Sequence, residues 1–440
     1  MNSYKFSLKQ YKAISKAEIE LNGITVLAGE NGAGKSTITR WLYYLVEVIV
    51  KYEQFLYEDL RRDISSIMRE YRMALRDTRM RSDSDIVMIP SIAKWNSMAR
   101  SIDCSNEENV ARVVREAKDL VVRFADYIQN NIGENGRITN RLARMMMYLN
   151  IDDNTTFDRE KFIDDDFKRI SLLYADYQIK LQKRSKQEMF EFIRQHYDSS
   201  IKNPSSIQLT EDRVAILEKL SVGHILGLQR AIYIDTPMAL GNDTIDNQLW
   251  DNLLDLLKRQ DNINLHVSLR KMLLRVQRII HGTVQMAEED FDSNLHYVRE
   301  DNLDIPIVEA ATGVKSFAYI IRLLENGYLD KNTLLIIDEP EAHLHPQWIV
   351  EYARILVLLK KEIGVRILIA SHNPDMVAAI QSIGKKEGIG DAITFYQAFS
   401  SPEHPFEYEY KNLGIEISEI FKSFNIAISR IQDYGRTDNQ

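Results

Sequence analysis

The glycine-rich stretch GENGAGKS at residues 29–36 constrains this chain more than any other segment. It fits the pattern GxxxxGK[ST], it follows an apolar run that predicts a buried strand at residues 24–29, and it precedes apolar residues at helical spacing. A loop in that context presents backbone N–H groups to phosphates at the start of a helix. The alternative, an ordinary glycine turn, does not account for the strand before it and the helix after it.

Each residue of the loop has an expected task. Lys35 reaches the β and γ phosphates and counts among the catalytic residues, and the Ser36 hydroxyl is a ligand for Mg²⁺. The loop therefore predicts a nucleotide with Mg²⁺ as the bound group. The residues expected to contact the nucleotide are Gly29, Asn31, Gly32, Gly34, Lys35, Ser36 and Thr37.

Two further apolar runs end in residues suited to phosphate chemistry. The run LLIIDEP at 334–340 predicts a buried strand that ends at Asp338, a metal ligand, and at Glu339, which orients and polarises the attacking water. Capping of the next helix is the alternative for these carboxylates. The run VRILIASHNP at 365–374 places His372 at another strand end, where it could contact the γ-phosphate. Strands alternating with helices at this spacing predict a parallel α/β sheet.

A similar run, AIYIDTP at 231–237, ends in Asp235 and could pass for the metal-binding strand. It lacks the following glutamate, and no histidine strand follows it closely. We interpret it as a neighbouring strand of the sheet.

The motifs GENGAGKST, ATGVKSF, LLIIDEPEAHLHP and LIASHNP together resemble those of ABC/SMC-type ATPase heads. They are most similar to the single-chain bacterial ATPases allied to RecF, to overcoming-lysogenisation-defect (OLD) proteins and to Septu-type (PtuA-like) antiphage-defence ATPases. The resemblance covers roughly residues 1–45 and 225–400. It implies an α/β, ABC/SMC-type P-loop ATPase head with a large helical insertion. It also implies ATP and Mg²⁺ as cofactors, a homodimer or higher oligomer of ATP-sandwiched heads, and a partner effector that is a nuclease or toxin.

In that family a Ser-Gly signature at a helix N-terminus reaches the γ-phosphate of the partner's ATP. The matching residues are Thr312 and Gly313, so a threonine replaces the usual serine and keeps its hydroxyl. The resemblance places His343 and His345 in a turn, where they either stabilise it or touch nucleotide. The remaining candidates are Gln229 for the Q-loop and Tyr11 for adenine stacking.

The domain boundaries follow from the change in pattern along the chain. Long charged and apolar stretches of helical period predict an insertion at 46–224, folded as a compact lobe or short hairpin, and residues 401–440 read as a C-terminal extension. Three strands are expected at the start, two of them edge strands. One amphipathic helix is expected at about 253–280, and the runs HGTVQMAEE, LHYVRE and DIPIVEA within 281–310 predict antiparallel strands. The segment after His372 is too short for the nuclease domain of OLD proteins, so we expect no nuclease site.

Composition sets the remaining limits. One cysteine excludes a disulfide framework, and no apolar run reaches the ~20 residues needed to span a bilayer, so we expect a cytoplasmic protein without a membrane partner. The net charge of −8 argues against a generally basic surface.

Basic patches at 61–81 and 270–278 leave nucleic acid possible as a partner, although solvated helix faces explain them as well. A DNA-repair or DNA-end-binding ATPase is therefore the alternative function. A near-inactive ATP-binding scaffold is disfavoured because Lys35, Asp338, Glu339 and His372 are all present.

Overall fold

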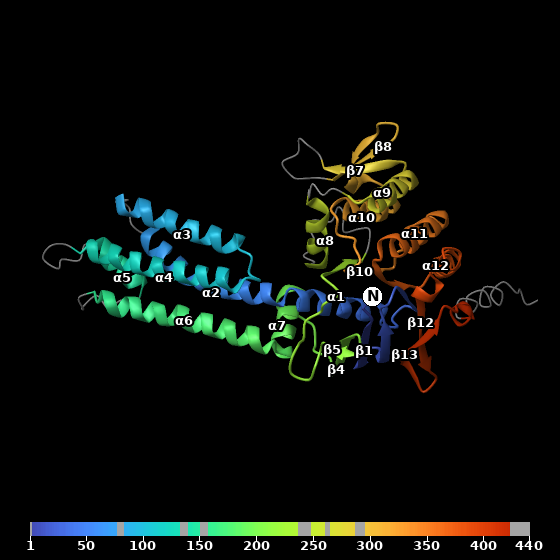
Figure 1. Cartoon of the computed structure of the whole chain (residues 1–440), viewed down its shortest axis with the longest axis horizontal. Coiled ribbons are helices and arrows are strands. Elements are labelled where there is room, and N and C mark those ends of the chain that lie inside the picture. The colour runs from blue at the N-terminus through green and yellow to red at the C-terminus, as the bar shows by residue number, and fades with distance from the viewer. Residues whose placement is uncertain are drawn as a thin grey trace, which may run out of the picture. The chain divides into compact units, whose positions relative to one another are not determined.

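The computed structural model describes residues 2–76, 83–132, 140–149, 157–235, 248–259, 265–286 and 295–422. The chain divides into two compact units, one made of Met1–Val50 with Met189–Gln440 and the other of Lys51–Glu188. We call the first the sheet unit and the second the helical unit (Figure 1). Within the described residues, no helix combines the length and apolar character needed to cross a membrane.

The sheet unit is built on a ten-stranded sheet with the order β5-β4-β1-β2-β13-β12-β3-β11-β10-β6. Its strands are β1 Tyr4–Tyr11, β2 Ile14–Glu20, β3 Ile24–Ala28, β4 Ser206–Glu211, β5 Val214–Ala215, β6 Arg230–Ile234, β10 Thr333–Asp338, β11 Arg366–Ser371, β12 Ile393–Ser401 and β13 His404–Gly414.

One half of this sheet is parallel. Strands β12, β3, β11, β10 and β6 pair in parallel with their neighbours, in a register that sets Ser371 opposite Ala28 and Asp338 opposite Ala370. Strands β3, β10 and β11 are buried along their whole length, which their continuous apolar sequences anticipate. The carboxyl ends of the three strands therefore meet at one edge.

The other half is mixed. β1 pairs antiparallel with both β2 and β4, while β2 pairs antiparallel with β1 and parallel with β13. The interpretation of the first two strands as edge strands is therefore wrong. Their outer partners come from segments about 200 and 400 residues further along the chain, which local pattern does not reveal.

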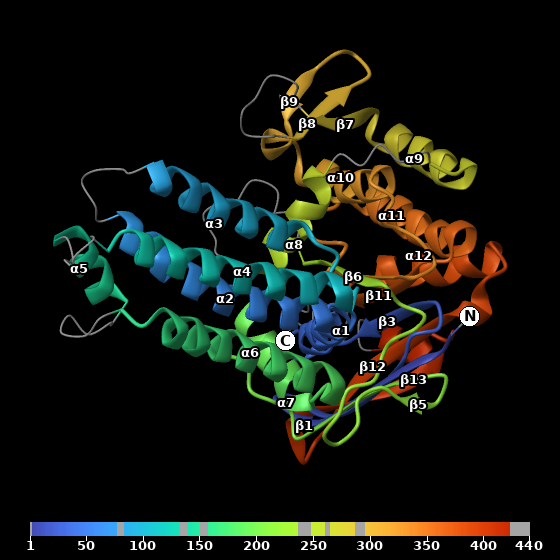
Figure 2. The same cartoon turned by 60° about the vertical axis from the view of Figure 1, so that its left-hand side comes forward.

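Helices and a small sheet complete the sheet unit. α11 packs against both α9 and α12, and α9 packs against α10 (Figure 2). The amphipathic segment expected as one helix near 253–280 is two helices, α8 and α9. The three antiparallel strands expected around residues 281–310 form a separate sheet. The helices are α1 Lys35–Val50, α7 Lys186–His196, α8 Gln248–Lys258, α9 Val267–Ile280, α10 Thr312–Glu325, α11 Pro346–Leu358 and α12 Pro374–Lys386, and the small sheet contains β7 Gly282–Met286, β8 Leu295–Arg299 and β9 Asp304–Pro306.

The helical unit is a bundle with a core of its own. Tyr71 stacks on Phe124 with ring centroids 4.2 Å apart, and its hydroxyl donates a hydrogen bond to the buried Asp166. Arg169 pairs with the same carboxylate at 2.8 Å, which leaves the buried charge compensated. The helices of this unit are α2 Tyr52–Arg76, α3 Asp83–Ser101, α4 Glu107–Asn130, α5 Asn140–Tyr148 and α6 Arg159–Lys183.

The limits of the units differ from the expected domains. The helical unit spans Lys51–Glu188 and not 46–224, because α1 continues to Val50 and residues 206–215 form β4 and β5 of the large sheet. Likewise, residues 401–440 are not simply an extension, because β13 within them pairs with both β12 and β2. Residues 423–440 lie outside the described part of the chain.

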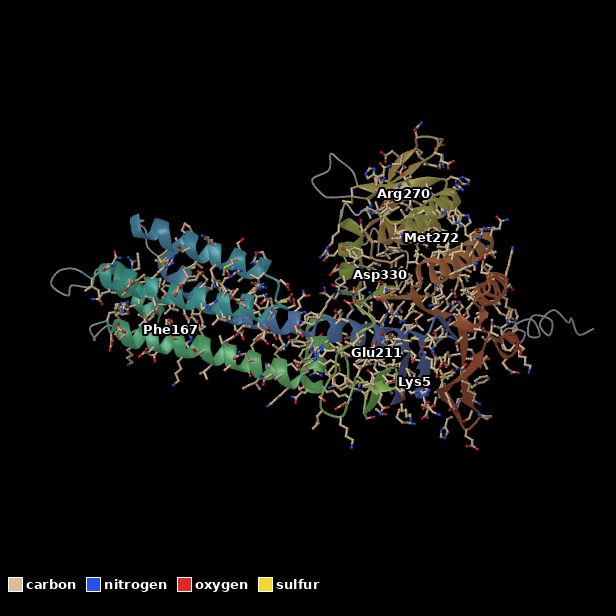
Figure 3. The ribbon with its side chains drawn as sticks, in the orientation of Figure 1. Lys5, Phe167, Glu211, Arg270, Met272 and Asp330 are labelled. Atoms are coloured by element: carbon tan, nitrogen blue, oxygen red, sulfur yellow. The ribbon has the colours of Figure 1, made fainter. Side chains whose placement is uncertain are left out.

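A buried carboxylate joins the two sequence segments that form the sheet unit. Glu211, at the end of β4, accepts hydrogen bonds from the Asn2 side chain, the Tyr4 hydroxyl and the backbone N–H groups of Leu226 and Gly227 (Figure 3). Burial by itself would raise the pKa of this carboxyl, but the hydrogen bonds outweigh burial and hold the pKa below its ordinary value.

We predict that Glu211→Ala lowers the free energy of unfolding by about 3 kcal/mol, because several buried donors lose their acceptor. Glu211→Gln, which keeps the shape of the side chain, should lower the free energy of unfolding by less. Because the folded pKa is depressed, the carboxylate stabilises the fold above the ordinary glutamate pKa of 4.5, and this stabilisation is lost as pH falls through the folded value. Chemical denaturation at pH 7 and at acid pH measures this, and a wild-type advantage over Glu211→Gln that persists at acid pH would contradict it.

Candidate nucleotide site

The loop between β3 and α1 has the backbone shape that its glycines predict. Gly32 and Gly34 adopt φ angles of +84° and +88°, a region that other residues rarely enter. A Cβ atom on Gly34 would also come within 2.8 Å of Ile14. The loop leads into α1, whose first N–H groups have no partner within the helix and are available to an anion.

The expected contact residues lie along this turn. Asn31, Gly32 and Ser36 are exposed, and the Thr37 amide donates to the Gly34 carbonyl at 3.1 Å. Gly29 lies against β12, where a Cβ atom would come within 2.9 Å of the Ala398 methyl group. The loop thus offers its polar groups on one open side.

Lys35 is the buried cation of the site. Its ammonium donates to the carbonyls of Gly29 and Glu30 at 2.8 and 3.0 Å. Burial lowers the pKa of this ammonium, against the opposing attraction of the nearby carboxylates, of which Glu339 and Asp338 contribute most. The residues named from two distant motifs therefore lie close enough to interact.

Asp338 ends β10 deep beside the loop. Its Oδ2 accepts a hydrogen bond from the Tyr233 hydroxyl at 3.1 Å, and the Ser36 side chain lies close to the carboxylate. Burial raises the pKa of Asp338, and the nearby carboxylates of Asp235 and Glu339 add to this effect. A cation here would favour the charged form.

The donors at this point fit a magnesium ion. The second oxygen of Asp338, Oδ1, is buried without a hydrogen-bond partner, and the Ser36 hydroxyl lies beside the same carboxylate. No group of three or more His, Cys, Asp or Glu side chains forms a metal site within the described residues. Magnesium commonly takes only one or two protein ligands and completes its shell with phosphate and water oxygens, so Ser36 and Asp338 suffice.

Glu339 and His372 face one another across the ends of β10 and β11. His372 Nδ1 lies 3.4 Å from Glu339 Oε1, and both side chains are 44% exposed. Glu339 has a φ of +52°, and its amide donates to the Ala370 carbonyl at 2.8 Å. A partly exposed carboxylate in this position can accept a proton from water.

Glu341 belongs to the site, although the sequence did not single it out. Its Oε1 accepts from the Ser371 hydroxyl at 2.8 Å and from the His372 amide at 3.0 Å. The side chain is only 4% exposed, and its Oε2 has no hydrogen-bond partner. It therefore fixes the segment that carries His372. No local pattern signals this role, because it comes from hydrogen bonds to the end of β11.

Tyr233 is the second residue that the sequence missed. Its hydroxyl lies 3.3 Å from Thr39 Oγ1 of α1 in addition to its bond with Asp338, so it links β6, α1 and β10. Asp235, next along from β6, pairs with Arg40 at 3.6 Å. The strand before Asp235 does pair with β10 as a neighbouring strand, as we interpreted it.

Thr312 and Gly313 begin α10, on a different element from the phosphate loop. Thr312 is half-buried, whereas Gly313 is buried against Trp348 and Leu344. The following Lys315 and Ser316 are buried and bond to nearby carbonyls, those of Val308 and Thr312. Within this motif the Thr312 side chain is the polar group that remains partly accessible.

Three weaker candidates take different places. Gln229 precedes β6, at the amino end of the strand, whereas the site forms at the carboxyl ends, so its assignment to the Q-loop is wrong. Tyr11 is 7% exposed and packs edge-on against Trp41, which leaves no free face for adenine. His345 caps α11 by accepting a hydrogen bond from the Gln347 amide, so it stabilises the turn, which was one of the two roles considered for it. His343 is exposed and has a φ of 62°.

Comparison with known proteins adds a family match. The model of the AAA ATPase domain family matches residues 1–377. The Retron Vc95 probable ATPase of Vibrio cholerae serotype O1 biovar El Tor is 20% identical over 404 residues, which cover 86% of this chain and 71% of that protein.

Solved structures of low similarity belong to two related classes. An SMC head domain with an extended coiled coil, bound to the C-terminal domain of ScpA, from Pyrococcus furiosus has a TM-score of 0.36 at 10% identity and covers 97% of this chain and 100% of its own. An ATP-binding cassette of an ABC transporter in its ADP conformation has a TM-score of 0.36 at 9% identity and covers 96% of this chain and 98% of its own. These TM-scores are low, so the α/β P-loop fold rests on the strand order and on the family match.

We predict that Lys35→Ala weakens ATP binding by about 100-fold or more, because this loop holds no other cation to face the phosphates. Equilibrium binding of a fluorescent ATP analogue measures the effect. Lys9→Ala, which removes a 47%-exposed lysine on β1, is the control and should bind as wild type does. Equal affinity in the Lys35 and Lys9 variants would place the nucleotide elsewhere.

Proposed function

Since the chain belongs to the AAA ATPase domain family, we propose that it binds ATP with Mg²⁺ at this edge of the sheet and hydrolyses the ATP. One observation carries the proposal: Lys35, Asp338, Glu339 and His372, named from three separate motifs, come together in the fold. Such a gathering of one cation, two carboxylates and one imidazole beside a phosphate loop suits phosphoryl transfer to water.

Each side chain has a role in the proposed reaction. Lys35 leaves its loop carbonyls to face the β and γ phosphates, while Ser36 and Asp338 hold Mg²⁺. Bound there, Mg²⁺ neutralises part of the phosphate charge. Glu339 accepts a proton from the attacking water, and His372, positioned by Glu341, hydrogen-bonds the γ-phosphate.

The proposed catalytic unit is a pair of heads. Thr312 and Gly313 at the start of α10 would contact the γ-phosphate held by a second copy, as the resemblance to ABC/SMC-type heads implies. The half-buried Thr312 and the helix N-terminus support this role, because both direct hydrogen-bond donors toward an anion.

The purpose of this cycle, in our proposal, is to gate a partner effector, a nuclease or toxin, in antiphage defence. The support is the motif resemblance to Septu-type defence ATPases and the similarity to a protein named as a retron ATPase. No nuclease site is proposed for this chain itself. Use of ATP agrees with the cytoplasmic location expected from the sequence.

We predict that Glu339→Gln still binds ATP but lowers kcat by about 100-fold or more, because the amide cannot take the proton from water. The unhydrolysed ATP should then hold two heads together. Phosphate release measures turnover, and light scattering during size-exclusion chromatography, with and without ATP and Mg²⁺, measures mass. Glu387→Gln, a surface carboxylate paired with Lys361, is the matched control.

The two readouts separate the parts of the proposal. Wild-type turnover in Glu339→Gln would make the catalytic assignment wrong. Loss of turnover without any ATP-dependent increase in mass would contradict the paired-head mechanism and leave the ATPase assignment standing.

The alternative function, direct action on nucleic acid, is favoured by one feature of the helical unit. Arg69 and Arg72 of α2 are both exposed, and neither forms an ion pair with any described residue. Arg62 on the same helix is held by Asp59. Free guanidinium groups suit phosphate contacts. Arg76, in the same patch, has a side chain outside the described residues.

If these arginines contact a single strand, we predict that the double variant Arg69→Gln, Arg72→Gln reduces the salt slope of binding, log K against log salt, by about 1.4. Fluorescence anisotropy of a labelled oligonucleotide at several salt concentrations measures it. Arg62→Gln serves as the control because its charge is already paired. Wild-type protein without salt-sensitive binding would count against the alternative.

A further inference from the structure

A cavity lies in the sheet unit between α9 and α11, with a volume of about 820 Å³. None of the residues that line it belongs to the phosphate loop or to the ends of β10 and β11. Cavities of roughly 300–1,000 Å³ are typical of small-molecule sites. This cavity is therefore large enough for a ligand of its own.

The cavity is lined by arginines from two sides. Arg275 and Arg278 come from α9, while Arg354 comes from α11. Arg278 is exposed and forms no ion pair with any described residue. The arginines thus line the open cavity from both helices, so a small anion in it can contact guanidinium groups from either side.

Two of the three arginines have acidic partners, one of which, Glu351, also lines the cavity. Arg275 Nη1 lies 2.5 Å from Glu362 Oε1, while Arg354 is 3.6 Å from Glu351 Oε2 with both side chains more than a third exposed. Exposed pairs of the latter kind are weak, so Arg354 can exchange its partner for a ligand oxygen. Guanidinium groups match phosphate oxygens in a bidentate way, which makes phosphate the favoured anion.

An indole completes the lining. Trp348 is partly buried and meets Phe317 of α10 edge-on, with centroids 5.5 Å apart at an interplanar angle of 84°. An aromatic side chain beside guanidinium groups offers a stacking surface for a planar ring. The lining thus offers contacts for phosphates and for a ring.

We propose that this cavity binds a small phosphorylated molecule with a planar ring, of the nucleotide class, at a second site separate from the phosphate loop. The arginines hold the phosphates, and Trp348 contacts the ring.

The cavity also touches the signature motif. A Cβ atom on Gly313 would come within 2.8 Å of Trp348 Cε3 and Cζ3, so the indole lies directly against the start of α10. A ligand that shifts this indole therefore changes the position of Thr312 and Gly313, and with it the closure of the heads. This regulatory part rests on the proposed ATPase function, whereas the binding part does not.

Binding is tested with ATP as the probe in Lys35→Ala protein, in which the phosphate loop has lost its lysine. Isothermal titration should show one site per chain with a Kd below about 1 mM. Adding the substitutions Arg278→Gln and Arg354→Gln to the Lys35→Ala protein should weaken ATP binding by about 10-fold or more. Arg270→Gln is the matched control, because Arg270 is exposed on the same helix and does not line the cavity (Figure 3).

A spectroscopic readout locates the ring. ATP should change the tryptophan fluorescence of the Lys35→Ala protein, and Trp348→Phe should abolish that change while the other three tryptophans remain. Inorganic tripolyphosphate, which has no ring, should bind more weakly than ATP. Equal binding of the two probes would overturn the planar-ring assignment.

Three results would overturn the second site. These are no saturable binding of either probe, binding that the arginine variant leaves unchanged, and tighter binding of a single-stranded oligonucleotide that the same variant removes. The third result would assign the cavity to nucleic acid. If ATP binds here yet the wild-type protein shows no hydrolysis, the second site stands and the proposed function fails.

Discussion

The parallel pairing of β3, β11 and β10 is the constraint on which the candidate site depends. Each strand contributes a different group at its carboxyl end: the phosphate loop after Ala28, His372 after Ser371, and Glu339 after Asp338. Because the side-chain direction alternates along a strand, a shift of one residue would turn Asp338 away from Ser36 and toward the opposite face. The buried apolar residues of the three strands hold this register, so the core of the sheet determines the chemistry at its edge.

Glu341 connects the ends of β10 and β11 by hydrogen bonds. A single carboxylate oxygen accepts from the Ser371 hydroxyl and the His372 amide, so the segment after β10 is tied to the end of β11. Such a buried acceptor is stabilising only while its donors are in place. Movement of His372 toward a phosphate would therefore displace Glu341. The short turn that joins Glu341 to Glu339 would then displace Glu339 as well.

Local sequence pattern was sufficient wherever a single segment forms the feature. The phosphate loop, the strands that end at Asp338 and Ser371, and the small antiparallel sheet all fall into this group. It was insufficient where partners lie far apart: the pairing of β1 with β4 and of β2 with β13 depends on segments hundreds of residues away. Tyr233 and Glu341 escaped for the same reason, since their roles come from hydrogen bonds across strands. Gln229 was misplaced because the helical insertion falls where the family's Q-loop should be, and no other motif marks that loop.

Two residues in a strained backbone conformation lie at this edge of the sheet. Glu339 and His343 both adopt positive φ angles, and each such residue costs of order 1 kcal/mol or more. Both lie in the turn between β10 and α11, where the Glu339 amide is bonded to the Ala370 carbonyl and Glu341 is buried. These contacts hold the turn in place and so maintain the positive φ angles. A relaxed backbone at Glu339 would rotate its carboxylate away from His372. The strained conformation therefore keeps a partly exposed carboxylate and an imidazole 3.4 Å apart beside the phosphate loop.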